Sequence, residues 1–173
     1  MNAIRIDRLR APTAQDVEQL ADVLLDCVEG GASVSFMLPL RRETALGFWR
    51  GVAEDALQGR RALLAARDGE GVIVGTVQLV LAQPENQPHR ADLAKMLVHR
   101  RARRHGIGAR LLQAAHAAGV EEGKTLLVLD TASADAERLY ERMGWLEVGV
   151  VPDFALLPQG GYCDTRFYYR RLP

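Results

Sequence analysis

Apolar residues recur at helical spacing twice in the first third of the chain. A short alternating pattern over residues 4–7 predicts a strand, and Thr13 and Asp16 then form a helix-start signature. The apolar positions that follow predict a helix up to the Gly30-Gly31 pair, and a second helical pattern covers about residues 43–57. The loop between these two helices mixes apolar side chains with serines.

Strand patterns replace the helical pattern from about residue 62. Residues 62–66 and 72–81 flank a turn of Asp and Gly residues, which predicts a β-hairpin. The remaining elements are expected as strands over about residues 90–98, 125–129, 145–151 and 165–171, and as helices over about 107–122 and 133–143. Residues 152–164, rich in Gly and Pro, predict a long loop.

This order of elements predicts an α/β fold in which one mixed β-sheet has helices on both faces, within a single domain over residues 1–173. The connection from the strand at Leu97 through a helix to the strand at Leu127 is a crossover, so these two strands should be parallel. The continuous apolar run over residues 125–129 is typical of a strand that is buried on both faces.

The composition is that of an ordinary globular domain. The chain has 173 residues, of which 48% are hydrophobic and 25% are charged, and this balance argues against disorder. A formal net charge of +0 argues against non-specific adhesion to nucleic acid. Cys27 and Cys163 are far apart and lack metal-ligand spacing, so we expect free thiols and no metal site. Residues 1–7 carry no leader-like segment and no apolar run is long enough to span a membrane, so a soluble, cytoplasmic protein is expected.

An arginine-rich turn with two glycines is the clearest chemical signal in the chain. Residues 95–112 read as an apolar strand, the turn, and a helix that Gly106 and Gly108 open. Glycines expose backbone N–H groups to a ligand, and the helix places its positive dipole end at the same point. The segment therefore predicts an anion cradle, and its arginines favour a ligand with more than one phosphate.

Three kinds of phosphate site compete for this segment. A P-loop is excluded because its spacing of Gly, Lys and Ser or Thr is absent, and a dinucleotide fingerprint lacks its third glycine. The pattern Arg-x-x-Gly-x-Gly remains, and Arg103 to Gly108 match it. Together with the following helix, the apolar strand and the segment Ala136 to Trp145, it resembles the GCN5-related N-acetyltransferase (GNAT) family. More narrowly, residues 30–34, 90–92 and 129–131 resemble the tabtoxin-resistance type of acetyltransferase.

The resemblance implies acetyl-coenzyme A (acetyl-CoA) as co-substrate. The backbone N–H groups of residues 104–109 would face its pyrophosphate, and the first two arginines of the motif would supply charge. Main-chain groups of residues 96–98 would bind the pantetheine arm, where the family splays two strands apart. The cofactor-binding positions implied by the family are Met96, Leu97, Val98, Arg103, Arg104, His105, Gly106, Ile107, Gly108, Ala109, Ser133 and Ala136. Ser133 stands where the family often has asparagine, and His99 stands where it often has proline.

Three side chains are candidates for the chemistry of acetyl transfer. Tyr140 matches the family's tyrosine near the thioester sulfur of acetyl-CoA and could protonate the leaving thiolate of CoA. Alternatively, Tyr140 could only pack against the sheet. Asp92 and Asp130, at the start of one central strand and the end of the next, could accept the proton of the amine or bind a cationic group. Asp130 could instead only cap the helix that follows it.

These residues together imply an N-acetyltransferase that moves an acetyl group directly to a primary amine in a ternary complex. A small acceptor, amino-acid-like or antibiotic-like, is expected in a pocket that includes Ser33, Phe36 and the loop around residues 153–164, although Phe36 could instead plug the core. The alternatives are a CoA-binding regulatory domain without catalysis and a nucleic-acid-binding module that uses the arginines of residues 100–110. The acceptor could also be a protein N-terminus or lysine. The sequence leaves the oligomeric state open, and a homodimer is compatible with it.

Overall fold

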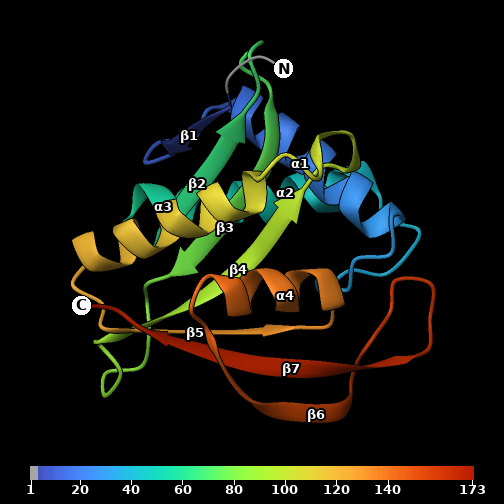
Figure 1. Ribbon diagram of the computed structural model, residues 1–173. Helices are drawn as coiled ribbons and strands as arrows, with labels where there is room; N and C mark the ends of the chain where they lie inside the picture. The colour runs from blue at the N-terminus through green and yellow to red at the C-terminus, as the bar shows by residue number, and fades with distance from the viewer. Residues whose placement is uncertain (1–3) are drawn as a thin grey trace.

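The computed structural model describes residues 4–173, and its elements follow the predicted order (Figure 1). The helices are α1 (Ala14–Glu29), α2 (Arg42–Leu57), α3 (Ile107–Glu121) and α4 (Ala134–Arg142), with a short 3-10 helix, η1, at Arg100–Ala102. The strands are β1 (Arg5–Arg8), β2 (Arg61–Arg67), β3 (Ile73–Val80), β4 (Arg90–Val98), β5 (Leu126–Thr131), β6 (Leu146–Leu156) and β7 (Tyr162–Arg171). Residues 1–3, part of the segment expected to carry no leader, lie outside the described residues.

A mixed sheet of seven strands runs through the molecule in the order β1-β2-β3-β4-β5-β7-β6. β4 and β5 are parallel, as the crossover through α3 predicts, and the other neighbouring pairs in this sheet are antiparallel. Helices α1 and α2 cover one face around Leu24 and Trp49, while α3 and α4 cover the other around Leu111 and Leu127 (Figure 1). The predicted fold is confirmed, with a separate apolar core on each side of the sheet. None of the helices within residues 4–173 is long and apolar enough to cross a membrane.

Side-chain caps fix where the helices begin. Thr13 Oγ1 accepts a hydrogen bond from the Asp16 N–H at 3.1 Å, and the Asp16 carboxylate accepts one from the Thr13 N–H at 2.8 Å, so the predicted capping box is present. Ser133 Oγ accepts a hydrogen bond from the Ala136 N–H at 3.3 Å and is the N-cap of α4. Capping of α4 by Asp130, which the sequence left open, is therefore ruled out.

Two predictions about the C-terminal half are wrong. The expected loop over residues 152–164 is mostly strand, because β6 continues to Leu156 and β7 begins at Tyr162. Pro152 is tolerated there because β6 is an edge strand, and the register with β7 shifts between Val151 and Ala155. β5 is also not buried on both faces: Leu127 and Leu129 are buried, but Leu126 and Val128 are partly exposed. The reason is that α1 and α2 pack on β2, β3 and β4 and leave that face of β5 uncovered.

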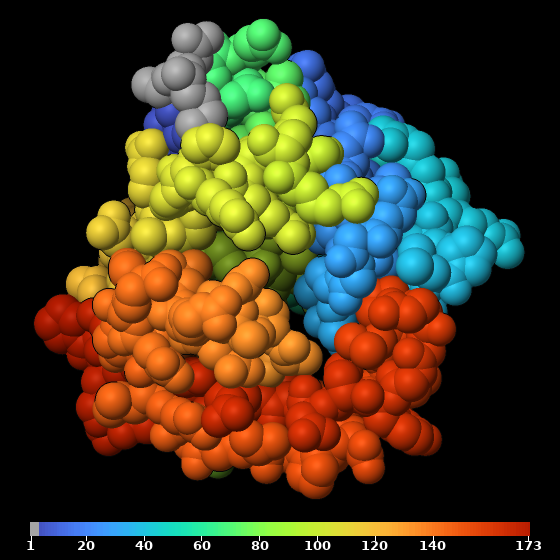
Figure 2. All heavy atoms as spheres, turned by 45° about the vertical axis from the view of Figure 1, so that its right-hand side comes forward, coloured from blue at the N-terminus to red at the C-terminus, as the bar shows by residue number. Residues whose placement is uncertain are grey.

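The feature that positions the site is the divergence of β4 from β5. The two strands pair only where Arg90, Ala91 and Asp92 face Leu126, Leu127 and Val128. Beyond this point β5 keeps β7 as its partner, and β4 keeps β3, so residues 93–98 of β4 have one edge without a neighbouring strand. Figure 2 shows a hollow at this place, between the yellow-green turn that precedes α3 and the orange helix α4. The splayed strands that the resemblance implied are present.

Candidate active site

The turn between β4 and α3 has the geometry of an anion cradle. Gly106 is the N-cap of α3 with a left-handed φ of 72°, and Arg104 is also left-handed with a φ of 64°. None of the backbone N–H groups of residues 104–109 donates a hydrogen bond to another group in the described chain. A row of free N–H groups at the positive end of a helix dipole is suited to bind a phosphate chain.

Gly108 lies close to α4. A Cβ built at this position would lie 2.9 Å from Leu139 Cδ2, so the missing side chain lets α4 pack closely against the start of α3. At Gly106, in contrast, a Cβ would meet nothing within 4 Å, and the left-handed backbone is what favours glycine. The two glycines therefore serve helix packing and turn geometry respectively.

Contacts with α1 hold the start of the cradle in place. The Asp26 carboxylate accepts hydrogen bonds from the Arg100 backbone N–H at 2.7 Å and from Arg100 Nε at 2.9 Å. Burial alone would raise the pKa of Asp26, but the hydrogen bonds from Arg100 lower it below its ordinary value. Arg103 turns back and donates from Nε to the Val98 carbonyl at 3.0 Å, with Nη2 3.8 Å from Cys27 Sγ. Arg103 therefore braces the turn, while Arg104 and His105 are exposed beside the free N–H groups.

The open edge of β4 carries the residues expected at the pantetheine arm. Leu97 is buried toward α1, whereas Met96 and Val98 pack toward α3 and α4. Between Ala94 and Leu97 the register with β3 shifts, and Lys95 in this bulge has a left-handed φ of 51°. The bulge lies on the part of β4 that has no partner toward β5.

Tyr140 is buried on α4 with its hydroxyl unpaired. The side chain is 4% exposed and packs against Trp145 and Tyr168, at ring-centroid distances of 5.8 and 6.1 Å. Its hydroxyl makes no hydrogen bond within residues 4–173, whereas the hydroxyl of Tyr168 donates to Glu141 at 3.1 Å. Burial and the Asp130 carboxylate raise the pKa of Tyr140 well above its ordinary value, so the phenol stays protonated. A protonated hydroxyl without a partner within residues 4–173 is free to donate a hydrogen bond to a group bound beside it.

The two candidate carboxylates have different surroundings. Asp130, at the end of β5, is exposed and accepts a hydrogen bond from Thr165 Oγ1 at 2.8 Å, and no cation in the described chain pairs with it. Asp92 is ion-paired with Arg90 and also accepts a hydrogen bond from Gln83 Nε2 at 3.1 Å. Only Asp130 lines the pocket described next.

A pocket of about 280 Å³ lies where the acceptor was expected. Its walls are the α1–α2 loop, the end of β5 and the β6–β7 hairpin; the lining residues with predicted roles are Ser33, Phe36, Asp130, Phe154, Cys163 and Asp164. Ser33 Oγ donates to the Leu156 carbonyl at 3.3 Å, and the Leu38 N–H donates to the Pro158 carbonyl at 2.8 Å. These contacts join the α1–α2 loop to the hairpin. The expected residues Asp153 and Tyr162 do not line this pocket.

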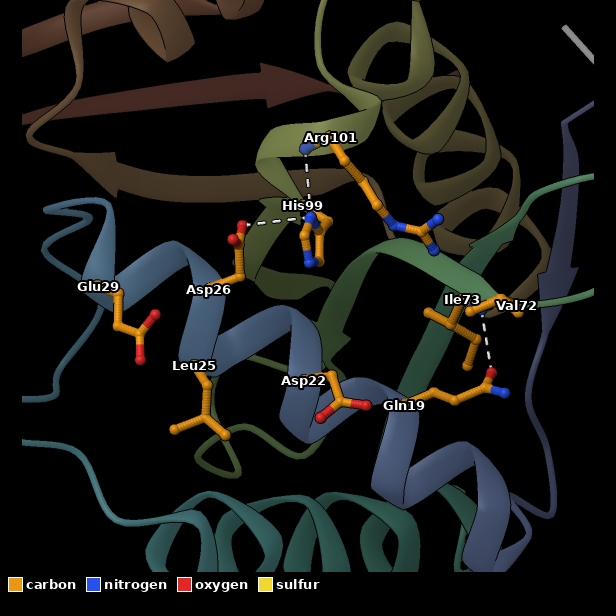
Figure 3. A pocket seen from close by; sticks show the side chains of 9 residues that line it. All are labelled: Gln19, Asp22, Leu25, Asp26, Glu29, Val72, Ile73, His99 and Arg101. Atoms are coloured by element: carbon orange, nitrogen blue, oxygen red, sulfur yellow. Dashed lines mark hydrogen bonds and ion pairs between the residues drawn. The ribbon is translucent and has the colours of Figure 1, made fainter.

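A second hollow, of about 380 Å³, lies beside α1 and contains none of the predicted site residues (Figure 3). Its polar groups are already paired with the protein: Gln19 accepts a hydrogen bond from the Ile73 N–H at 3.0 Å, and Asp26 contacts His99 and Arg100. The paired groups of this hollow hold η1 and the cradle against α1, so its role is structural.

Sequence reasoning missed Lys95 and Thr165, and it gave no sign of the backbone strain at four positions. The non-glycine residues with left-handed φ are Ser35, Lys95, Arg104 and Asp153, and they border the cradle, the pocket or the hairpin beside it. Such strain concentrates at functional sites, but the one-dimensional pattern carries no signal for it. Both cysteines are free, and no group of metal-ligating side chains occurs within the residues described.

The sequence matches a known protein family over most of its length. The model of the Acetyltransferase (GNAT) family matches residues 23–145. A relative from Azospirillum brasilense, named an uncharacterized N-acetyltransferase in the hisH-hisA intergenic region, is 31% identical over 132 residues, which are 75% of this chain and 76% of the relative.

Solved structures share the whole fold. A putative acetyltransferase from Salmonella typhimurium, solved with its cofactor acetyl-CoA, has a TM-score of 0.80 at 16% identity and covers 99% of this chain and 95% of its own. An N-acetyltransferase from Staphylococcus aureus Mu50 has a TM-score of 0.82 at 15% identity, and the match covers 99% of this chain and 100% of the other. A ribosomal-protein-alanine N-acetyltransferase from Brucella melitensis has a TM-score of 0.78 at 24% identity, and the match covers 98% of this chain and 99% of the other.

Proposed function

Because the chain belongs to the acetyltransferase (GNAT) family and is an N-acetyltransferase that uses acetyl-CoA, we propose that it acetylates the primary amine of a small molecule by direct transfer. The observation that carries this proposal is one pocket of about 280 Å³, lined by the unpaired carboxylate of Asp130 and enclosed by loop and hairpin. A pocket of this size suits a small, amino-acid-like or antibiotic-like amine.

The residues present fit acetyl-CoA. The free N–H groups of residues 104–109 would hold the pyrophosphate, with the charge of Arg104 beside them. The open edge of β4 over residues 96–98 would bind the peptide-like pantetheine arm. Ser133 and Ala136 would contact the pantetheine arm from the opposite side. In the α4 cap the Ala136 N–H donates a hydrogen bond to Ser133 Oγ. Acetyl-CoA, when bound, supplies the acetyl thioester and a thiolate leaving group.

The side chains divide the proton transfers between them. Asp130 accepts a proton from the acceptor's ammonium group, directly or through a water, so that the neutral amine can attack the thioester carbonyl. The Thr165 hydroxyl holds the Asp130 carboxylate in place. Tyr140 donates the proton that the leaving thiolate requires. Asp92 is engaged by Arg90 and Gln83, so we assign it no proton transfer and instead a part in holding the start of β4.

Thiol release over a panel of small amines tests this proposal. The wild-type protein should release CoA thiol with at least one primary amine, and Tyr140→Phe should lower kcat by about 100-fold, within the range for loss of a general acid. Tyr168→Phe is the matched control, because it removes a neighbouring hydroxyl that is bonded to Glu141. It should keep most of the activity.

The alternatives give different results. A CoA-binding regulatory domain would be stabilised by acetyl-CoA yet release no thiol with any amine. A nucleic-acid-binding module would bind duplex DNA with a steep salt dependence and gain no stability from acetyl-CoA. An acceptor that is a protein N-terminus or lysine would show as acetylation of peptides but not of free amines.

We also propose that two copies associate through β6. This strand is at one edge of the sheet, and its side chains include Leu146, Val148 and Val150, which are 56%, 67% and 45% exposed. Exposed apolar residues along an outer strand favour pairing with another chain.

A further inference from the structure

The acceptor pocket has a lysine at one side that the proposed chemistry does not use. Lys95 lies in the β4 bulge, and its Nζ donates a hydrogen bond to Ser35 Oγ at 3.1 Å. The same ammonium lies 5.7 Å from the centroid of the Phe48 ring. Ser35 lines the pocket, so Lys95 reaches the pocket wall through this contact.

Both partners of this contact are held in a costly backbone conformation. Lys95 has a φ of 51° and Ser35 a φ of 79°, and this left-handed conformation is unfavourable for a non-glycine residue. Neither residue supports the core, because both are at least partly exposed. Strain at two positions that meet over a pocket indicates a functional contact rather than a packing requirement.

The ammonium of Lys95 has neutral contacts only. A hydroxyl and an aromatic ring surround it, and it forms no ion pair with any carboxylate of residues 4–173. Burial lowers the pKa of Lys95, the charge of Arg61 lowers it further, and Asp130 acts in the opposite direction. A bound anion would offset the cost of burying this charge.

The pocket therefore presents an unpaired cation near one wall and an unpaired carboxylate, Asp130, at another. Resting on the proposed function, we propose that the acceptor is zwitterionic: Lys95 and Ser35 bind its carboxylate while its amine lies at Asp130. This assigns Lys95 as the residue that selects amino-acid-like acceptors over simple amines.

Matched acceptors test this assignment. Initial rates are measured with a panel of L-amino acids and with the corresponding amino-acid amides, which keep the amine and lack the carboxylate. Lys95→Met should lower kcat/KM for the acids by about 10- to 100-fold, mainly through KM, because a hydrogen bond to a charged group contributes about 1.5–3 kcal/mol. The rates with the amides and the KM for acetyl-CoA should change little.

Three further variants separate binding from other roles. Lys95→Arg keeps the charge and should restore part of the preference for acids, and Ser35→Ala should weaken the same preference. Lys124→Met is the control, because Lys124 is the chain's other lysine and bonds to the Leu81 and Pro88 carbonyls outside the pocket. An equal loss with acids and amides in Lys95→Met, or no loss with either, would overturn the assignment.

A labelling experiment detects binding of the acceptor at Lys95 without requiring turnover. Since Lys95 and Lys124 are the only lysines, mass spectrometry after limited treatment with an amine-acylating reagent reports each separately. With CoA present, a bound amino acid should protect Lys95 and not Lys124, and the amide should protect neither. If the wild type acetylates amines without any preference for acids, this inference fails and the proposed function stands. If it acetylates no amine at all, the proposed function fails.

Discussion

Asp130 is the residue on which the proposed transfer most depends. Its carboxylate is exposed in the pocket, held by Thr165 Oγ1 at 2.8 Å, and it is not the cap of α4. Asp130→Asn keeps the shape and the hydrogen bond to Thr165 but cannot accept a proton. We expect kcat to fall by about 100-fold with an unchanged KM for acetyl-CoA, measured by initial rates of thiol release.

Asp135→Asn provides the control for this change. Asp135 is close in sequence but its side chain is 89% exposed and paired with Arg138 on α4. It should retain full activity. Wild-type rates in Asp130→Asn would show that the amine loses its proton elsewhere.

His116 should make the fold sensitive to mild acid. Burial, together with the charge of Arg170, lowers the pKa of His116 to about 4, and its Nε2 accepts a hydrogen bond from Trp145 Nε1 at 3.0 Å. The unfolded chain takes up this proton below a pH of about 6.5, while the folded chain does not until about pH 4, so stability falls across this window as pH decreases. Urea unfolding at several pH values should show a shallower decline in His116→Gln, which keeps an acceptor for Trp145 but cannot be protonated.

His105→Gln is the comparison at an exposed histidine. Its unfolding should follow the same pH dependence as the wild type. Identical slopes in all three proteins would mean that carboxylates alone set the acid sensitivity.

At the scale of elements, the cradle depends on its attachment to α1. The Asp26 carboxylate holds both the backbone N–H and the side chain of Arg100, and it is only 13% exposed. Asp26→Asn weakens these charge-assisted hydrogen bonds, so the turn should bind acetyl-CoA less well. We expect KM for acetyl-CoA to rise by about 3- to 10-fold with kcat little changed, which matches a loss of about 1 kcal/mol.

Asp22→Asn, on the same helix, is the matched control for Asp26. Its carboxylate pairs with Arg42 at 2.5 Å on the surface and does not touch the cradle. A KM as high as that of Asp26→Asn would point to α1 as a whole rather than to this contact.

The sequence allowed the elements of the fold to be predicted because each carries a local signal. Thr13 with Asp16, the periodicity of α3 and the hairpin turn before Val72 are set by residues close in the chain. Both strands of the β6–β7 hairpin were predicted, but their extensions over residues 152–156 and 162–164 were missed, because Pro and Gly in an edge strand read as loop when the partner strand is not known.

Local sequence patterns predict the site only where it is one continuous segment. The cradle is such a segment, so its glycines and arginines were found together. The pocket joins the α1–α2 loop to a hairpin more than a hundred residues later, which no local pattern reports, so its two segments were expected only through the family resemblance. Lys95 was missed because a lysine in a strand pattern reads as a solvent-facing residue, and only the bulge turns it toward Ser35.

At the scale of the whole molecule, the sheet separates two tasks. On the proposed assignment, β4 and its turn would hold acetyl-CoA, while β5 and the β6–β7 hairpin line the pocket proposed for the acceptor. The edge strand of that hairpin, β6, exposes Leu146 and Val148. Its unpaired edge is the surface through which we expect a second copy to bind.

Light scattering during size-exclusion chromatography tests the assembly. The wild type should have about twice the chain mass of 19.1 kDa, and Val148→Glu should shift it toward the monomer, because a buried unpaired carboxylate at the interface is costly. Val120→Glu places the same charge on α3 at a residue that is 44% exposed, and it should remain dimeric. A monomeric wild type at every concentration would contradict pairing through β6. Since the acceptor pocket includes Phe154, Ala155 and Leu156 of β6, the monomeric variant should also show a higher KM for the amine than the Val120→Glu control.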